Sequence, residues 1–265
     1  MVVDALLKQK KLRTLYVDFP FDADQSPSQA GLEDTIFKCL TEEHYQHLEK
    51  LELRKAWTPG QMSAAAKAIG CMGLKDLTLH MSYFYDWDEE TEFTKLPPRP
   101  NGQRSELVSI NLSGITFANS QHLIESYFNP STLRKLELRD CIGYDSVCLA
   151  LSNRPGTANL EEVVLVSWES NNNIPDVIGF VACCKNLKVL SLDLTSFTDQ
   201  SMLQLITAVA ESRETLEVLS ICLRNDHNWH GESLYYHPKD LEIIKAFGNL
   251  REVGMSYAIH PKDVR

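Results

Sequence analysis

The sequence predicts an α/β solenoid, with a parallel sheet on its concave face and helices on its convex face. Three observations predict this fold. A short phrase of one leucine, two variable residues, an aliphatic residue, one variable residue and another aliphatic residue occurs nine times. The first leucines of successive copies lie 26 to 36 residues apart, which leaves room for one strand and one returning helix. Most intervening segments carry apolar residues at helical spacing.

The nine phrases predict nine strands, because apolar residues alternate over the last four positions of each phrase. One unit cannot bury its apolar face alone, so the stacked units are expected to share a continuous core. The predicted inward residues are Leu12, Leu15 and Val17; Leu48, Leu51 and Leu53; Leu74, Leu77 and Leu79; Leu107, Ile110 and Leu112; Leu133, Leu136 and Leu138; Leu160, Val163 and Leu165; Leu187, Leu190 and Leu192; Leu216, Leu219 and Ile221; and Leu250, Val253 and Met255.

Six of the intervening segments are predicted helices. Each begins with Ser, Asp or Pro, residues that satisfy or tolerate the unpaired N–H groups of a first turn. Their starting residues are Ser63, Ser120, Asp145, Pro175, Asp199 and Pro238. Because strands alternate with helices, every strand is expected to run parallel to its neighbours.

The fifth unit carries the most specific motif. Leu133, Leu136 and Leu138 are followed by Cys141 and then Asp145. This unit resembles the cysteine-containing leucine-rich repeats that follow the F-box in substrate receptors of ubiquitin ligases, and the nine in-phase copies resemble the long-repeat leucine-rich family from Leu12 to Met255. The resemblance implies a horseshoe fold and recognition of a protein substrate. No F-box is visible in the chain, so we expect the adaptor-binding part of such a receptor to be missing or to lie elsewhere.

The regular repeat predicts a single leucine-rich-repeat domain over residues 1–265, with about nine repeats. Longer loops are expected at 19–35, 83–106 and 224–238. All three follow a predicted strand, so they should lie on the same rim. They either form a binding rim or are insertions that cost little, since lengthening a loop adds little entropy.

Composition restricts the partners and the compartment. The formal net charge is −10, which argues against nucleic acid and anionic membranes because those partners select basic surfaces. No apolar run reaches the roughly 18 residues needed to span a bilayer, and no signal peptide is evident. The seven cysteines show no CxxC pair, so reduced and mostly buried thiols are expected. The predicted location is cytoplasmic or nuclear.

The residues that flank the inward aliphatics should point away from the core and form the candidate binding surface. Charge is concentrated on units two to five, whereas units six to eight show a more apolar strip. The alternative is that neighbouring Lys and Glu side chains simply pair across strands. The candidate partner-binding residues are Glu52, Arg54, His80, Asn111, Glu137, Arg139, Val164 and Asp193 on the strands, and Trp87, Trp168 and Trp229 after them.

The aromatic residues that follow the strands divide into two groups. Phe84, Phe117 and Phe197 each lie ten residues after a first leucine, a slot that the resemblance assigns to the core. The three tryptophans fall off this slot, which makes them candidates for contact with a partner. Packing beneath a loop is the alternative role for each tryptophan.

The sequence shows no phosphate-binding glycine loop, no GxSxG and no HExxH, so no enzymatic activity and no cofactor are expected. The leading hypothesis is a non-enzymatic module that binds a protein or peptide in a ubiquitin-ligase pathway. A ubiquitin-independent leucine-rich-repeat scaffold or inhibitor is an alternative. A metal-dependent enzyme using His227, His230 and His237 is a third hypothesis, although solvated loop histidines explain that cluster more simply.

Overall fold

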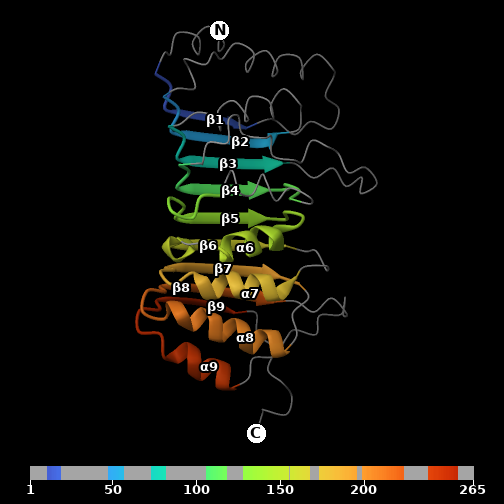
Figure 1. Cartoon of the computed structure of the whole chain (residues 1–265), viewed down its shortest axis with the longest axis vertical. Helices are drawn as coiled ribbons and strands as arrows, with labels where there is room; N and C mark the ends of the chain where they lie inside the picture. Colours follow the sequence, from blue (N-terminus) through green and yellow to red (C-terminus); the bar gives the residue numbers. More distant parts are fainter. Residues whose placement is uncertain are drawn as a thin grey trace, which may run out of the picture.

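The structure is a computed structural model of the chain (Figure 1). It describes residues 11–18, 47–56, 73–81, 106–117, 128–154, 156–167, 173–195, 199–223 and 238–255. These residues form an α/β arrangement in which a nine-stranded parallel sheet packs against helices. The predicted α/β class and the predicted parallel strands are therefore confirmed.

The strands follow one another across the sheet in chain order, from β1 to β9, and each neighbouring pair is parallel. All nine predicted strands are present. Their bounds are β1 Thr14–Asp18, β2 Lys50–Ala56, β3 Asp76–Met81, β4 Ser109–Ser113, β5 Lys135–Arg139, β6 Glu162–Val166, β7 Val189–Leu194, β8 Val218–Leu223 and β9 Glu252–Met255.

The register is fixed by a backbone contact that recurs at each of the eight strand junctions. The carbonyl oxygen of the residue before each strand accepts two N–H groups from the corresponding position of the next repeat. The Arg134 oxygen, for example, accepts from the Glu161 and Glu162 nitrogens at 2.8 and 3.0 Å. Equivalent residues of all nine units therefore lie side by side, as in the row through Leu51 and Leu77.

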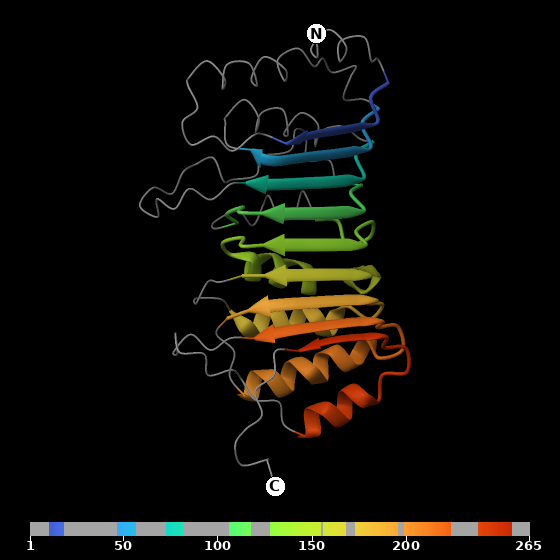
Figure 2. The ribbon, with the colours of Figure 1, turned by 180° about the vertical axis from the view of Figure 1, so that it is seen from behind.

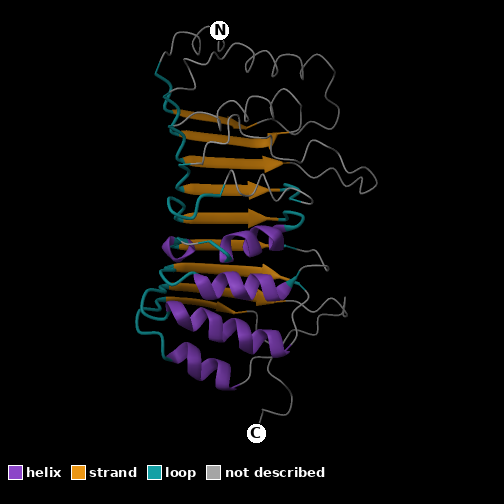
Figure 3. Cartoon of the chain, in the orientation of Figure 1, coloured by secondary structure: helices purple, strands orange, loops and turns teal. Residues whose placement is uncertain are grey.

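The described helices lie against one face of the sheet (Figure 1 and Figure 3), and Figure 2 shows the opposite face in front. Their bounds are α6 Tyr144–Ser152, α7 Ile174–Cys183, α8 Asp199–Val209 and α9 Pro238–Lys245, with short 3-10 turns η3 Thr157–Asn159 and η4 Ala210–Ser212. These four helices begin within one residue of the predicted starts. The helices predicted from Ser63 and Ser120 lie outside the described residues.

The hydrophobic core lies between the sheet and the helices. Leu51, Leu77 and Leu136 are each at most 1% exposed, as the alternating pattern predicts. Phe117 is also buried and meets Phe128 edge to face, with ring centroids 6.0 Å apart, so its predicted core role is confirmed. Phe84 and Phe197 lie outside the described residues.

The described cysteines are all free thiols. Cys141 and Cys148 are buried, and burial raises the pKa of the Cys141 thiol to about 12. Of the adjacent pair, Cys184 is buried and Cys183 is half-buried. Cys222 is half-buried rather than buried, because its place in β8 sets it on the face away from the helices.

The long loops fall almost wholly outside the described residues. Of 19–35 nothing is described, and of 83–106 only Glu106. Of 224–238 only Pro238 is described, and it begins α9 rather than ending a loop. Their predicted place on one rim therefore stays a prediction. Among the helices that the structure does describe, none has the length and apolarity to cross a bilayer.

Candidate functional site: the open face of the sheet

We call the sheet surface opposite α6–α9 the open face (Figure 2). Alternation along each strand sends every second side chain to it, as the half-buried and buried pattern of β4 shows. Because the strands are in register, these side chains form three rows that cross the sheet. The first row is Thr14, Lys50, Asp76, Ser109, Lys135, Glu162, Val189, Val218 and Glu252; the second is Tyr16, Glu52, Thr78, Asn111, Glu137, Val164, Ser191, Ser220 and Gly254; and the third is Asp18, Arg54, His80, Ser113, Arg139, Val166, Asp193 and Cys222.

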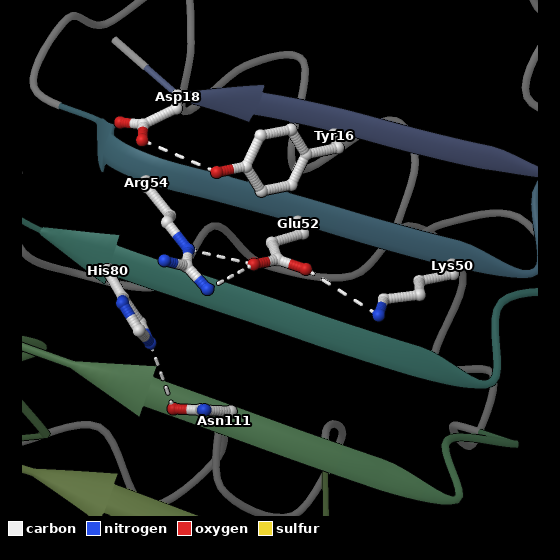
Figure 4. Close-up of polar contacts among 7 residues, drawn as sticks. All are labelled: Tyr16, Asp18, Lys50, Glu52, Arg54, His80 and Asn111. Atoms are coloured by element: carbon white, nitrogen blue, oxygen red, sulfur yellow. Dashed lines mark hydrogen bonds and ion pairs between the residues drawn. The ribbon is translucent and has the colours of Figure 1, made fainter. Parts of the chain in front are cut away.

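In β2, two cations converge on one carboxylate (Figure 4). The Arg54 Nε and Nη2 atoms each lie 2.8 Å from the Glu52 Oε1, and the Lys50 Nζ lies 3.6 Å from the Oε2. The Glu52 side chain is only 12% exposed, whereas that of Arg54 is 46% exposed. Glu52 therefore holds the arginine in place while the guanidinium stays accessible to solvent.

Strand β1 adds a second contact to this arginine. The Arg54 Cζ lies 5.7 Å from the centre of the Tyr16 ring, and the Tyr16 hydroxyl donates to the Asp18 carboxylate at 3.3 Å. The pKa of Arg54 is raised above its ordinary value by the hydrogen bond to Glu52 and by that residue's charge. The guanidinium is therefore a permanent cation oriented by two neighbours.

His80 and Asn111 join β3 to β4 in the middle of the open face. The His80 Nε2 lies 3.2 Å from the Asn111 Oδ1 (Figure 4). The amide oxygen can only accept, so this contact requires the proton of His80 on Nε2. Both predicted site residues are therefore brought together, and the pair is partly buried.

In β5 the same residue types recur. The Arg139 Nε donates to the Glu137 Oε1, and the Lys135 Nζ lies 2.6 Å from Glu162 in β6. The cross-strand Lys–Glu pairing that the sequence offers as an alternative thus exists at Lys135. Both arginines, by contrast, pair with the glutamate two residues earlier on their own strand.

Strands β6 to β8 carry the apolar strip. Val166, Val189 and Val218 are half-buried on the open face. Val164 is only 9% exposed, so it offers less contact area than its predicted binding role needs. Asp193 lies in the third row on β7 and is half-buried.

Asp140 follows β5 in a left-handed backbone conformation, with φ of 48°. Its Oδ1 atom is buried and has no hydrogen-bond partner among the described residues. Burial raises the pKa of this carboxyl, Arg139 opposes that rise, and Asp193 adds to it. Asp140 is thus a carboxylate with an uncompensated desolvation cost at the rim of the open face.

Sequence reasoning missed a fourth row, at the residues that precede the strands, where charges nearly alternate in sign. Lys188 lies 2.7 Å from Glu161, and Arg251 lies 3.6 Å from Glu217. The residue directly after each first leucine would have revealed the row. It comprises Arg13, Glu49, Lys75, Val108, Arg134, Glu161, Lys188, Glu217 and Arg251. Its ion pairs support the register rather than a binding site.

The remaining candidates lie outside the described residues. They are Trp87, Trp168 and Trp229 and the histidines of the metal hypothesis, His227, His230 and His237. Within the described ranges, no group of three or more His, Cys, Asp or Glu side chains could hold a metal ion. The described site therefore consists of the predicted strand residues other than Val164, together with Tyr16, Asp18 and Lys50.

This arrangement can bind a partner through guanidinium and ammonium groups, hydrogen-bonding side chains and an aliphatic strip. The rows cross eight or nine strands, so they offer an extended surface. The chain matches no protein-family model and no curated protein.

Proposed function

We propose that the chain is a non-enzymatic protein-interaction module of the leucine-rich-repeat type, whose open face binds a protein or peptide. The observation that carries the proposal is the open face itself: three in-register rows of side chains opposite the described helices. Ion pairs hold its long side chains in place, so ordering them on binding costs less entropy.

The surface composition supports a protein partner. Anchored arginines, Tyr16 and a valine strip combine the residue types that dominate binding energy at protein interfaces with aliphatic contact area. The formal net charge of −10 counts against nucleic acid. We further propose, from the cysteine-bearing fifth repeat, that the module recognises substrates in a ubiquitin-ligase pathway. A ubiquitin-independent scaffold or inhibitor would use the same face.

The proposal is tested by placing the same bulky cation on opposite faces of the molecule. Ser191→Arg adds an arginine to the second row of the open face, and Gln204→Arg adds one to an exposed position of α8. Proteins captured from cells by each variant and by the wild type are then quantified by mass spectrometry. Thermal melting confirms that both variants are folded.

We expect Ser191→Arg to lose specific partners that Gln204→Arg retains. Equal capture by the two folded variants would overturn the proposal.

The ubiquitin hypothesis has its own readout: adaptor subunits of ubiquitin ligases should co-purify with the product as it occurs in the cell. If partners are captured without any adaptor, the scaffold or inhibitor function replaces it.

A further inference from the structure

The open face contains the same five-residue sequence twice. Lys-Leu-Glu-Leu-Arg forms residues 50–54 of β2 and residues 135–139 of β5. Both arginines fall in the third row, both are held by the glutamate two residues earlier, and both side chains are 46% exposed. The two copies therefore present two equivalent guanidinium groups to one side of the sheet.

The pairing of each arginine with its glutamate leaves some guanidinium N–H donors for a ligand. A guanidinium has five N–H donors. At Arg54 the glutamate occupies Nε and Nη2, and at Arg139 it occupies Nε. The remaining donors form a fork that matches a carboxylate. A guanidinium that is already oriented loses less side-chain freedom on binding.

The spacing of the two arginines is set by the sheet. Strand order places β3 and β4 between them, which makes three steps from β2 to β5. At about 4.8 Å per step, the two positions lie about 14 Å apart along the row. Four residues of an extended peptide cover about 13–14 Å. Two acidic residues four positions apart would also share one face of that peptide, since side chains alternate.

The residues between and beyond the arginines define the rest of the ligand. His80 and Ser113 lie between them in the same row and offer polar contacts. Val166 follows Arg139 in the third row, and its half-buried side chain provides an aliphatic surface.

The charges limit where an acidic segment can bind. The open face of β2–β5 carries Lys50, Arg54, Lys135 and Arg139 against Glu52, Asp76 and Glu137, one net positive charge on a chain of −10. Asp18 and Asp193 occupy the same row beyond the two arginines and would repel further acidic residues.

We propose that Arg54 and Arg139 bind two carboxylates, spaced four residues apart, of one extended peptide that crosses the strands. A neighbouring aliphatic residue of the peptide packs on Val166. The polar residue midway between the carboxylates faces His80 and Ser113. This inference rests on the proposed function, and it names the chemistry of the partner.

The test uses a fluorescein-labelled peptide, Leu-Thr-Glu-Thr-Ser-Thr-Glu-Thr-Leu, and the full chain. The β-branched residues favour an extended backbone, and the symmetric sequence serves either chain direction. Companion peptides carry the glutamates two or three residues apart, or glutamine in place of both. Fluorescence anisotropy should show the tightest binding for the peptide with the four-residue spacing. The other spacings and the glutamine peptide should bind about tenfold or more weakly, because each of these changes removes at least one charged contact.

The protein variants are Arg54→Gln and Arg139→Gln, with Arg213→Gln as the matched control. Arg213 is an exposed arginine that also pairs with a glutamate, Glu214, but lies outside the open face. Each open-face variant should weaken peptide binding by about tenfold, and the control variant should leave the affinity unchanged. Arg54→Lys keeps the charge and should give an intermediate loss, which keeps the test valid if a glutamine variant unfolds.

Several outcomes would overturn the inference: no binding of any peptide, equal binding at all spacings, or an equal loss in Arg213→Gln. Displacement of the bound peptide by an oligothymidine at the same concentration would also overturn it, because the arginines would then bind a phosphate backbone as well as carboxylates. The capture experiment with Ser191→Arg is independent. If that variant loses its partners but the peptide does not bind, the proposed function stands and the acidic-peptide inference fails.

Discussion

Strands β2 and β5 share one five-residue sequence but lie in different surroundings. In both, the arginine pairs with the glutamate two residues earlier. The lysines differ: Lys50 turns to its own Glu52 at 3.6 Å, whereas Lys135 reaches Glu162 on the next strand at 2.6 Å. The glutamates differ too, since the Glu52 side chain is 12% exposed and that of Glu137 is 25% exposed.

This comparison distinguishes side-chain contacts that arise within one strand from contacts and burial that depend on the adjacent strands. The Arg–Glu pair arises within the strand, because residues two apart lie on the same face. Both lysines face an acidic residue on the next strand, Asp76 beside Lys50 and Glu162 beside Lys135. Lys50 nevertheless contacts Glu52 on its own strand, whereas Lys135 contacts Glu162. Burial of the glutamate likewise depends on the adjacent strands.

The largest expected effect is a loss of folding stability when the core-facing leucines of the two copies are truncated. Leu53→Ala and Leu138→Ala each remove a side chain that is at most 1% exposed. Each should lower the free energy of unfolding by about 2–5 kcal/mol through lost burial and a residual cavity. Urea unfolding measures both, with the 45% exposed Leu203→Ala as control. A cost near that of the control at either leucine would show that the two copies are not packed alike.

The next effect separates the two glutamates. Glu52→Gln removes the charge that holds two cations and should cost about 1–2 kcal/mol, since hydrogen bonds to charged groups are the stronger ones. Glu137→Gln should cost under about 1 kcal/mol, because that side chain is more solvated. Unfolding by urea gives both values, and Glu214→Gln, at an 82% exposed position, controls for the substitution. A larger cost at Glu137 would contradict the ranking.

A smaller effect separates the two lysines. A double-mutant cycle with Lys135→Met and Glu162→Gln should give a coupling of about 0.2–1 kcal/mol, the range of exposed ion pairs. The cycle with Lys50→Met and Glu52→Gln should give less, because the atoms are farther apart. Both couplings should weaken in about 0.5 M NaCl, which shortens the screening length. Coupling that does not respond to salt would rule out an ionic origin.

The smallest effect concerns the residue that follows β5, Asp140. Burial raises the pKa of this carboxyl in the folded protein. Wild-type stability should therefore fall as pH rises from the unfolded-state pKa through the folded-state pKa. Asp140→Asn removes that loss and tolerates the positive φ, so its gain in unfolding midpoint should be larger at about pH 7 than at about pH 3. A gain of equal size at both pH values would assign the effect to the backbone instead.

The fold could be predicted from the sequence because the signal is local and repeated. The alternation seen at Leu136 and Leu138 recurs in all nine units, and it predicts each strand and its buried face. The buried face is wrong for β9 at the edge of the sheet, where the predicted inward residue Val253 is 49% exposed. The half-buried state of Cys222 follows from the same alternation, because Cys222 comes directly after the inward residue Ile221.

The helix starts near Asp145 and Pro175 were predictable because acidic residues and proline favour the first turn of a helix. The residues that cap α6 and α7, Gly143 and Asn173, make no side-chain capping hydrogen bond.

The candidate site could be predicted only in part. The positions of Arg54 and His80 on the open face follow from alternation alone. Their partners do not, because Asn111 comes from the next repeat and Tyr16 from the preceding one. The low exposure of Val164 likewise depends on side chains of adjacent strands. Contacts across repeats require the register, which single units do not specify.

The central claim is that the open face is where a partner binds, and photocrosslinking tests it most directly. A photoreactive amino acid is placed at Ser113, in the third row of the open face, and in a matched variant at Gln204 on α8. After irradiation in cells, the proposal predicts discrete partner adducts from the Ser113 position and none of these from Gln204. The same adducts in equal yield from both positions, or adducts from Gln204 alone, would contradict it.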